Sequence, residues 1–167
     1  MTATTADRPA TAGFLDAMAA LAGGVCVVTA TATDGTPVGF TSTAVMSLSR
    51  TPQLIAIGVQ RGSRTLPLLQ GGGRFALNIL AADGESVSRR FADPAADRFA
   101  GLEWTAGEGD APLLLAQSTY AVLCRVREEV AAGDHLLLIA DIEEIIPGQG
   151  RVSALVHHAR RYHGVGA

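Results

Sequence analysis

The pattern of apolar and polar positions divides the chain into one helix followed by many strands. Apolar residues recur at helical spacing over residues 14–22, and Gly23-Gly24 ends that run. A β-branched run at 25–31 predicts a strand, and Asp34-Gly35 is typical of a two-residue hairpin turn. The chain is then expected to return as a second strand over 37–48.

The remaining pattern alternates strands with short helices. Further strands are expected at 53–59, 74–81, 113–129, 134–146 and 152–157, the last followed by a short basic tail. Short helices are expected at 62–70 and 83–92, and the loop 93–111 holds Phe99, Leu102 and Trp104 as apolar anchors. The order lacks the βαβ rhythm of a parallel sheet. We therefore predict a mainly β fold with short helices, in which an antiparallel sheet closes or nearly closes into a barrel, because closure removes exposed strand edges.

Length and composition fit one domain. The 167 residues are 48% apolar and 17% charged, and we expect a flexible tail at 1–10 followed by a single domain at 11–167. All 13 basic residues are arginine, which excludes a Schiff-base or P-loop lysine. The net charge of −3 argues against nucleic acid as a partner.

The chain shows no targeting or membrane-spanning pattern. The first residues lack an apolar core flanked by positive charge, so we expect no signal peptide. No uncharged apolar stretch reaches the roughly 20 residues that cross a bilayer, which predicts a cytoplasmic protein without a membrane partner. Cys26 and Cys124 stand in apolar runs without metal-ligand spacing, and we expect both to be buried.

Three segments carry candidate binding residues. The segment 39–49 is a strand-like run of hydroxyls and small side chains that would let a flat ligand approach the backbone, although threonine also suits an ordinary edge strand. Arg61-Gly62-Ser63-Arg64-Thr65 follows a strand and opens a helix, which favours either a phosphate site or a plain serine cap. Arg89-Arg90 could join a phosphate clamp or simply balance a helix C-terminus.

Histidines give weaker signals. Asp134-His135 precedes a very apolar strand, where the histidine is either a bystander or a donor to an anionic or carbonyl group. The histidines at 157, 158 and 163 match no metal-ligand spacing, so we expect no metal site.

The order of these pieces resembles the flavin reductase family with the FMN-binding split β-barrel fold, of Greek-key type. The carrying motifs are GFTSTAVMSLSRTPQL, GSRTLPLL, RFALNIL, SRRFADPAADRFAG and AGDHLLLIADIEE, and the resemblance covers about residues 14–163. It is greatest to the small reductase component of two-component flavin-dependent monooxygenases. The fold and activity below are what this resemblance implies.

The resemblance assigns roles to individual positions. The isoalloxazine ring would lie along Thr41, Ser42, Thr43 and Ala44, with Ser47 in the same motif, and the ribityl chain and phosphate would be held by Gln60, Ser63, Arg64 and Thr65. Arg90 and Phe91 match a pair near the phosphate. Asp134 and His135 match a motif that binds NAD(P)H, with His135 positioning the nicotinamide, and Arg161 and Tyr162 match a pair on the nicotinamide side.

The implied function is an NAD(P)H:flavin oxidoreductase that reduces FMN or FAD for a partner monooxygenase. A homodimer is implied, for which the apolar strands 113–123 and 136–140 could supply the interface. Two alternatives remain: a flavoprotein of the same fold that holds its flavin tightly and acts on its own substrate, and a non-enzymatic protein that binds flavin or haem.

Overall fold

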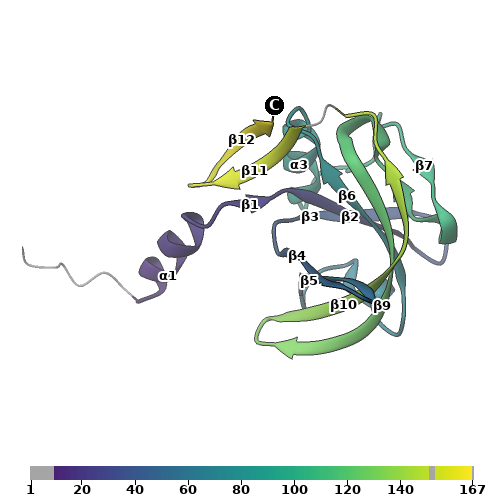
Figure 1. The fold of residues 1–167 in the computed structure, drawn as a ribbon, viewed down its shortest axis with the longest axis horizontal. Coiled ribbons are helices and arrows are strands. Elements are labelled where there is room, and N and C mark those ends of the chain that lie inside the picture. Colours follow the sequence, from purple (N-terminus) through teal and green to yellow (C-terminus); the bar gives the residue numbers. More distant parts are fainter. Residues whose placement is uncertain (1–9, 151–152, 167) are drawn as a thin grey trace, which may run out of the picture.

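The structure is a computed structural model that describes residues 10–150 and 153–166 (Figure 1). Its centre is a seven-stranded sheet with the strand order β3-β2-β6-β9-β10-β5-β4, in which every pair is antiparallel. The strands are β2 (Cys26–Thr31), β3 (Pro37–Ser42), β4 (Val45–Arg50), β5 (Gln53–Gln60), β6 (Arg74–Leu80), β9 (Ser118–Ala132) and β10 (His135–Pro147). The prediction of a mainly β, antiparallel fold is confirmed.

Smaller elements cover this sheet. A second sheet joins β1 (Gly23–Gly24), β11 (Ser153–His158) and β12 (Arg161–Gly166), and β7 (Thr105–Ala106) pairs with β8 (Pro112–Leu113). The helices of the described residues are α1 (Ala10–Ala19), α2 (Leu66–Leu69) and α3 (Glu85–Ala92), with 3₁₀ turns η1 (Glu108–Asp110) and η2 (Leu115–Gln117). Within the described ranges, no helix has the length and apolar character needed to cross a membrane.

The prediction of a single strand over 37–48 was wrong, because the segment forms parts of two strands on opposite edges of the main sheet. β3 ends at Ser42, β4 begins at Val45, and five other strands lie between them in the sheet. The Ser42 hydroxyl accepts the N–H of Ala44 at 3.1 Å, a local turn that redirects the chain. The described strands show no β3–β4 pairing, so the sheet is not closed by hydrogen bonds.

The expected basic tail is also a strand. β12 returns along β11 through a turn at Ala159 and Arg160, both with positive φ (49° and 62°). Neither residue is a glycine or asparagine, so the turn left no signal in the sequence. The expected strand at 152–157 is confirmed as β11 except for Val152, and the tail at 1–10, apart from Ala10, also lies outside the described residues.

Several boundaries shift, and the strand expected at 113–129 begins only at Ser118, after β8 and η2. The Asp34-Gly35 hairpin is confirmed, but its loop is longer than two residues: Ala32 N–H donates to the Thr36 carbonyl at 2.9 Å, and Gly35 takes φ 84°. The helix expected at 62–70 shortens to α2, with Thr65 as its N-cap instead of Ser63. The first helix ends at Ala19, before the Gly23-Gly24 pair, which is β1.

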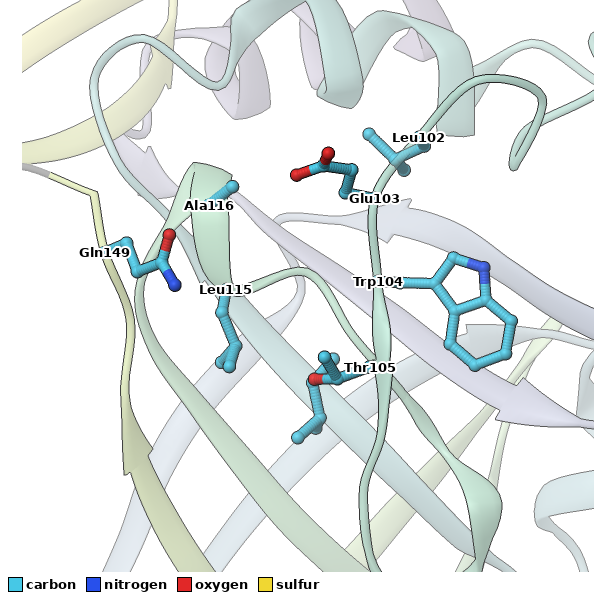
Figure 2. Close-up of a pocket in the computed structure, with 8 residues that line it drawn as sticks. Leu102, Glu103, Trp104, Thr105, Leu115, Ala116 and Gln149 are labelled. Carbon is cyan, nitrogen blue, oxygen red and sulfur yellow. The ribbon is translucent and has the colours of Figure 1, made fainter.

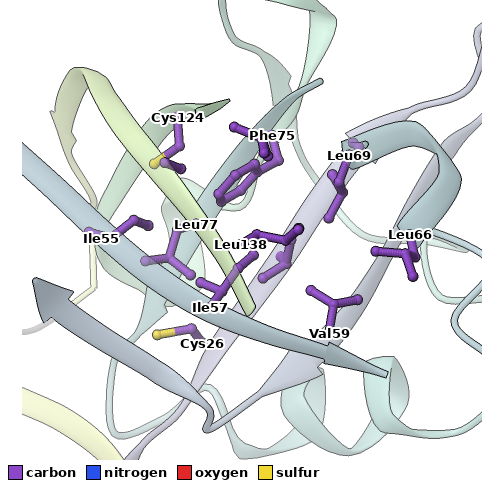
Figure 3. Packing of buried hydrophobic residues seen from close by; sticks show 14 of the residues in the cluster. Cys26, Ile55, Ile57, Val59, Leu66, Leu69, Phe75, Leu77, Cys124 and Leu138 are labelled. Atoms are coloured by element: carbon purple, nitrogen blue, oxygen red, sulfur yellow. The ribbon is translucent and has the colours of Figure 1, made fainter. Parts of the chain in front are cut away.

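The core lies on both faces of β2, which is why that strand reads as a continuous apolar run. One face packs into the cluster drawn in Figure 3, together with the fully buried Ile57, Phe75 and Leu138. The other face packs against α3 and β11. Both cysteines are buried as expected, and burial raises the pKa of each thiol to about 12.

Candidate functional site

The link between the two sheet edges forms one wall of a cavity. Thr43 and Ala44 cross from β3 to β4, and the Gly58 N–H donates to the Ala44 carbonyl at 2.8 Å. A Cβ on Gly58 would lie 3.2 Å from the Cβ of Ala44, so a glycine permits this close approach. The Thr41 hydroxyl donates to the Ser88 carbonyl of α3 at 2.6 Å, which fixes the helix against the same wall.

The segment after β5 forms a second wall. The Arg61 N–H donates to the Asp134 carbonyl at 2.9 Å, and Arg61 Nε donates to the Gly133 carbonyl at 3.0 Å. These bonds hold the segment against the β9–β10 turn, where His135 pairs with Gln60 in the sheet register. Two sequence segments that lie far apart in the chain are therefore brought together at the cavity.

Arg64 and Arg98 lie close enough for their charges to interact, and both donate to backbone carbonyls. Arg64 Nη2 donates to the Pro94 carbonyl at 3.1 Å, and Arg98 donates to the carbonyls of Asp93 and Gly39. Within the part of the chain that is described, neither arginine forms an ion pair. Burial, and then the charge of Arg64, lower the pKa of Arg98, and Asp93 offsets only part of this. The pair carries surplus positive charge that suits an anionic group.

His135 is oriented by its neighbour. Its Nδ1 lies 2.8 Å from Asp134 Oδ1, and since a carboxylate only accepts, Nδ1 carries the proton of this bond. That hydrogen bond, and then the electrostatic interaction between the two side chains, lower the pKa of Asp134. The remaining ring nitrogen, Nε2, is the atom available to a ligand.

These walls enclose a cavity of about 530 Å³, named here the hydroxyl–arginine cavity. It gathers nine of the residues expected from the sequence: Thr41, Ser42, Thr43, Ala44, Gln60, Ser63, Arg64, Phe91 and His135. It is also lined by Phe40, Gly58, Gly62, Ala92, Pro94 and Arg98. Small side chains, backbone groups and two cations thus surround one space, which suits a flat ligand with an anionic end.

The other expected site residues lie outside this lining. Ser47 is exposed on β4, and Thr65 is buried beside an adjoining cavity. Arg90 Nη1 donates to the Ala100 carbonyl at 2.8 Å, and Asp134 acts through His135. Arg161 pairs with His158 at the start of β12.

Tyr162 connects to the cavity through hydrogen bonds. The Ser88 hydroxyl donates to the Tyr162 hydroxyl at 2.9 Å, and the Ser88 carbonyl accepts from Thr41. The guanidinium of Arg89 stands 4.9 Å from the centre of the Tyr162 ring, a cation–π contact. The C-terminal hairpin therefore supports α3 behind the cavity wall.

Sequence reasoning missed Arg98 as a site residue. The motif SRRFADPAADRFAG contains it, but the loop 93–111 has no periodicity that could place it against the carbonyl of Gly39 in β3. The one available signal was a third arginine in the same motif as Arg89 and Arg90.

A separate cavity of about 420 Å³ lies around Trp104 (Figure 2). Its lining includes Glu103 and no basic residue, so it does not suit an anionic ligand. Phe99 and Leu102 pack on the core as expected, whereas Trp104 is 38% exposed. Among the residues described, no group of histidine, cysteine or acidic side chains could hold a metal ion.

Comparison with known proteins places this arrangement in a family. Residues 18–166 match the model for the flavin reductase like domain. A flavin reductase (NADH) of Kitasatospora aureofaciens is 39% identical over 150 residues, which cover 89% of this chain and 78% of that protein. An NADH:riboflavin 5′-phosphate oxidoreductase of Streptomyces pristinaespiralis is 35% identical over 158 residues, covering 93% and 90%.

Solved structures of two reductases have the same fold as this chain. The NADH:FAD oxidoreductase of Streptomyces globisporus, in complex with NAD and FAD fragments, superposes with a TM-score of 0.85 at 25% identity and covers 96% of each chain. The flavin reductase component of a bacterial two-component tryptophan halogenase superposes with a TM-score of 0.84 at 25% identity, covering 94% of this chain and 99% of that one. From the family model and these relatives together, the chain belongs to the flavin reductase-like domain family.

Proposed function

We propose that this chain is an NAD(P)H-dependent flavin reductase whose flavin lies in the hydroxyl–arginine cavity. The expected activity is confirmed at the level of the family, in which relatives are named as NADH-dependent flavin reductases. The observation that carries the assignment of the site is that Arg64 and Arg98, neither of which forms an ion pair among the described residues, line one cavity with the small, exposed residues Thr43 and Ala44.

The residues of the cavity fit a flavin. A flat heteroaromatic ring needs small side chains along its face and edge, which residues 41–44 and Gly58 supply. A flavin phosphate needs donors that are not already neutralised, and Arg64 and Arg98 supply these. Ser63 adds a hydroxyl beside Arg64.

The flavin supplies the hydride acceptor and the reduced nicotinamide supplies the hydride, so the chain needs no nucleophile of its own. Its residues bind and orient. His135, with Nδ1 bonded to Asp134, presents Nε2 as an acceptor for an N–H donor such as a nicotinamide carboxamide. Backbone dipoles of the 41–44 segment stabilise negative charge that develops on a bound ring.

The direct test is oxidation of NADH and NADPH by the purified chain with FMN, FAD or no added flavin. We expect nicotinamide oxidation that depends on flavin and saturates with it. Absence of flavin-dependent turnover with both nicotinamides would refute the proposed function. Tight flavin that turns over only with an added organic substrate would instead favour a self-contained flavoprotein.

We propose that the main sheet is the split barrel of this family, with Greek-key connections. The strand order is not that of a simple meander, since β3 and β4 are consecutive in the chain and lie at opposite edges. The Thr43-Ala44 link joins those edges covalently, which supports a barrel left open along one seam.

We also propose a homodimer with the flavin at the subunit interface, built from different elements than the sequence suggested. The apolar side chains expected to form the interface, such as Leu123 and Leu138, are buried within their own chain. In contrast, α1 projects from the body in Figure 1 and exposes Phe14 (63%), Leu15 (56%) and Met18 (48%). A second copy would bury this face.

Sedimentation of the chain and of a Phe14→Glu variant tests the dimer. We expect a dimer for the former and dissociation for the latter, with Glu85→Gln on α3 as a surface control that leaves the dimer intact. A monomer at micromolar concentration for the unsubstituted chain would contradict it.

The partner we propose is a separate enzyme that uses reduced flavin, a monooxygenase in the first instance. Support comes from similar reductases named as components of a trigonelline monooxygenase and a styrene monooxygenase, and of a tryptophan halogenase. Because the cavity is open to solvent along its exposed residues, reduced flavin can leave it. Release of reduced flavin to an added oxygenase, measured as product formed per NADH consumed, tests this step.

A further inference from the structure

The hydroxyl of Tyr162 contacts α3 behind the wall of the hydroxyl–arginine cavity. Ser88, which is fully buried in α3, donates its hydroxyl to the Tyr162 hydroxyl at 2.9 Å. The carbonyl of the same serine accepts the Thr41 hydroxyl at 2.6 Å, and Thr41 lines the cavity. Tyr162 is not among the residues that line the cavity. Its hydroxyl is therefore connected to the cavity through Ser88 and Thr41.

α3 is a helix that depends on contacts of this kind. It has eight residues, and its N-cap is Gly84, which has no side chain to cap the first turn. Helices this short are stabilised mainly by tertiary packing. α3 supplies Phe91 and Ala92 to the cavity lining and also holds Thr41. A displacement of α3 would therefore move one wall of the cavity.

The strand that carries Tyr162 is anchored independently of α3. β12 pairs with β11 along its whole length. In the turn between them, the Ala159 N–H donates to the Ala19 carbonyl at 2.7 Å, and Arg160 Nη2 lies 2.8 Å from Asp16 Oδ1. β12 is thus fixed by β11 and by α1, so it is a support against which α3 can be held.

The ring of Tyr162 and its hydroxyl make separate contacts with α3. The Arg89 guanidinium stands 4.9 Å from the ring centre, and Arg89 Nε donates to Glu85 Oε1 at 2.8 Å. The hydroxyl contact is the one with Ser88. Replacing the tyrosine with phenylalanine removes the hydroxyl contact and keeps the ring, so this substitution isolates the hydrogen bond.

We infer that Tyr162 is a positioning residue for the flavin: its hydroxyl holds Ser88, and Ser88 holds Thr41 at the cavity wall. The inference rests on the proposed function, because it takes the hydroxyl–arginine cavity as the flavin site. It differs from the role that the family resemblance implies, which places Tyr162 on the nicotinamide side. The first role acts on the affinity for flavin, whereas the second acts on the KM for NADH.

Binding and steady-state assays of Tyr162→Phe separate the two roles. We expect the Kd for FMN to rise about fivefold, which corresponds to one hydrogen bond of about 1 kcal/mol. The KM for NADH at saturating FMN should stay within about twofold of its starting value. Tyr120→Phe is the matched control and should change neither, because Tyr120 is the other tyrosine of the chain and is 49% exposed on β9. A raised KM for NADH with an unchanged Kd for FMN would overturn the inference.

A double substitution tests whether the effect passes through Ser88. Ser88→Ala removes the donor of the hydrogen bond and leaves the backbone carbonyl that binds Thr41. Because Ser88→Ala and Tyr162→Phe break the same bond, the double variant should bind FMN within about twofold of the weaker single variant. Losses that multiply would show that Tyr162 acts by another route, which contradicts the inference.

Amide hydrogen exchange of the ligand-free chain gives a measurement that needs no flavin. Exchange of the α3 amides should be about fivefold faster in Tyr162→Phe and unchanged in Tyr120→Phe, because local opening of the helix becomes easier. Unchanged exchange in α3 would overturn the inference whatever the flavin assays show. If the unsubstituted chain binds neither FMN nor FAD, the proposed function fails, and the exchange rates still decide whether Tyr162 holds α3.

Discussion

Replacing Arg64 with alanine is the most direct test of the anion site. Its guanidinium makes a single hydrogen bond, to the Pro94 carbonyl, and forms no ion pair among the described residues, so its loss leaves no buried charge unpaired. A hydrogen bond to a charged group contributes about 1.5–3 kcal/mol, but exposed ion pairs contribute only about 0–1 kcal/mol. Because Arg64 is exposed but would make a charge-assisted hydrogen bond, we expect a loss between these two ranges, about 1.4 kcal/mol, or a tenfold increase in the Kd for FMN.

Riboflavin provides the matched ligand, since it lacks the phosphate. Fluorescence titration at low and high salt should show that Arg64→Ala weakens FMN and leaves riboflavin unchanged, with a smaller salt dependence than the unsubstituted chain. Arg90→Ala is the matched variant: the family resemblance places Arg90 near the phosphate, whereas its guanidinium bonds to Ala100 outside the cavity lining. We expect it to lose less FMN affinity than Arg64→Ala. Equal losses for FMN and riboflavin would refute the phosphate role of Arg64.

Three other predictions follow from particular side chains. His135→Ala should raise the KM for NADH more than the KM for flavin in steady-state assays, since the ring lines the cavity and is oriented by Asp134; equal changes would leave it a structural role only. Cys26 and Cys124 should resist a thiol reagent until urea unfolds the chain, because burial raises both pKa values to about 12 and disfavours the reactive thiolate; rapid labelling of the folded chain at neutral pH would contradict their burial. Leu138→Ala should lower the free energy of unfolding by about 2–5 kcal/mol, measured by urea denaturation, because the fully buried side chain leaves a cavity; a loss below about 1 kcal/mol would show that the core collapses around it.

Most strands could be predicted from the sequence, because the residue pattern of each strand and the turn beside it involve only residues that are close together in the chain. The strand in the run 25–31 was identified by its β-branched residues, and the helix containing Val87 and Phe91 was identified by the four-residue spacing of that pair. The break between β3 and β4 was invisible, since the turn at Ser42 uses a hydroxyl within a run that favours extended structure. The turn at Ala159 and Arg160 was invisible because neither residue is of a type that usually adopts a positive φ.

The site was predictable where its residues are close in sequence and unpredictable where the fold joins them. Thr41 to Ala44 and Ser63-Arg64 stand out as chemistry-bearing motifs, and the structure brings both to one cavity. Arg98 depends on a loop whose position is set by contacts with Gly39 and Asp93, and no local pattern encodes those contacts.

The two-residue link between β3 and β4 has a consequence for how the protein assembles. Residues 41–44 and 58–64 are near neighbours in the chain, yet the sheet path between β3 and β4 runs through β2, β6, β9, β10 and β5. The strand that joins β5 to the rest of that path is β10, which begins only at His135. Strand pairings between residues that are far apart in the sequence form slowly, because the entropy of loop closure is lost before the stabilising contacts form. A ribosome-bound chain that has not yet released β10 therefore has every residue of the cavity lining except His135, but it does not have the cavity. Ligand binding would report completion of the whole sheet.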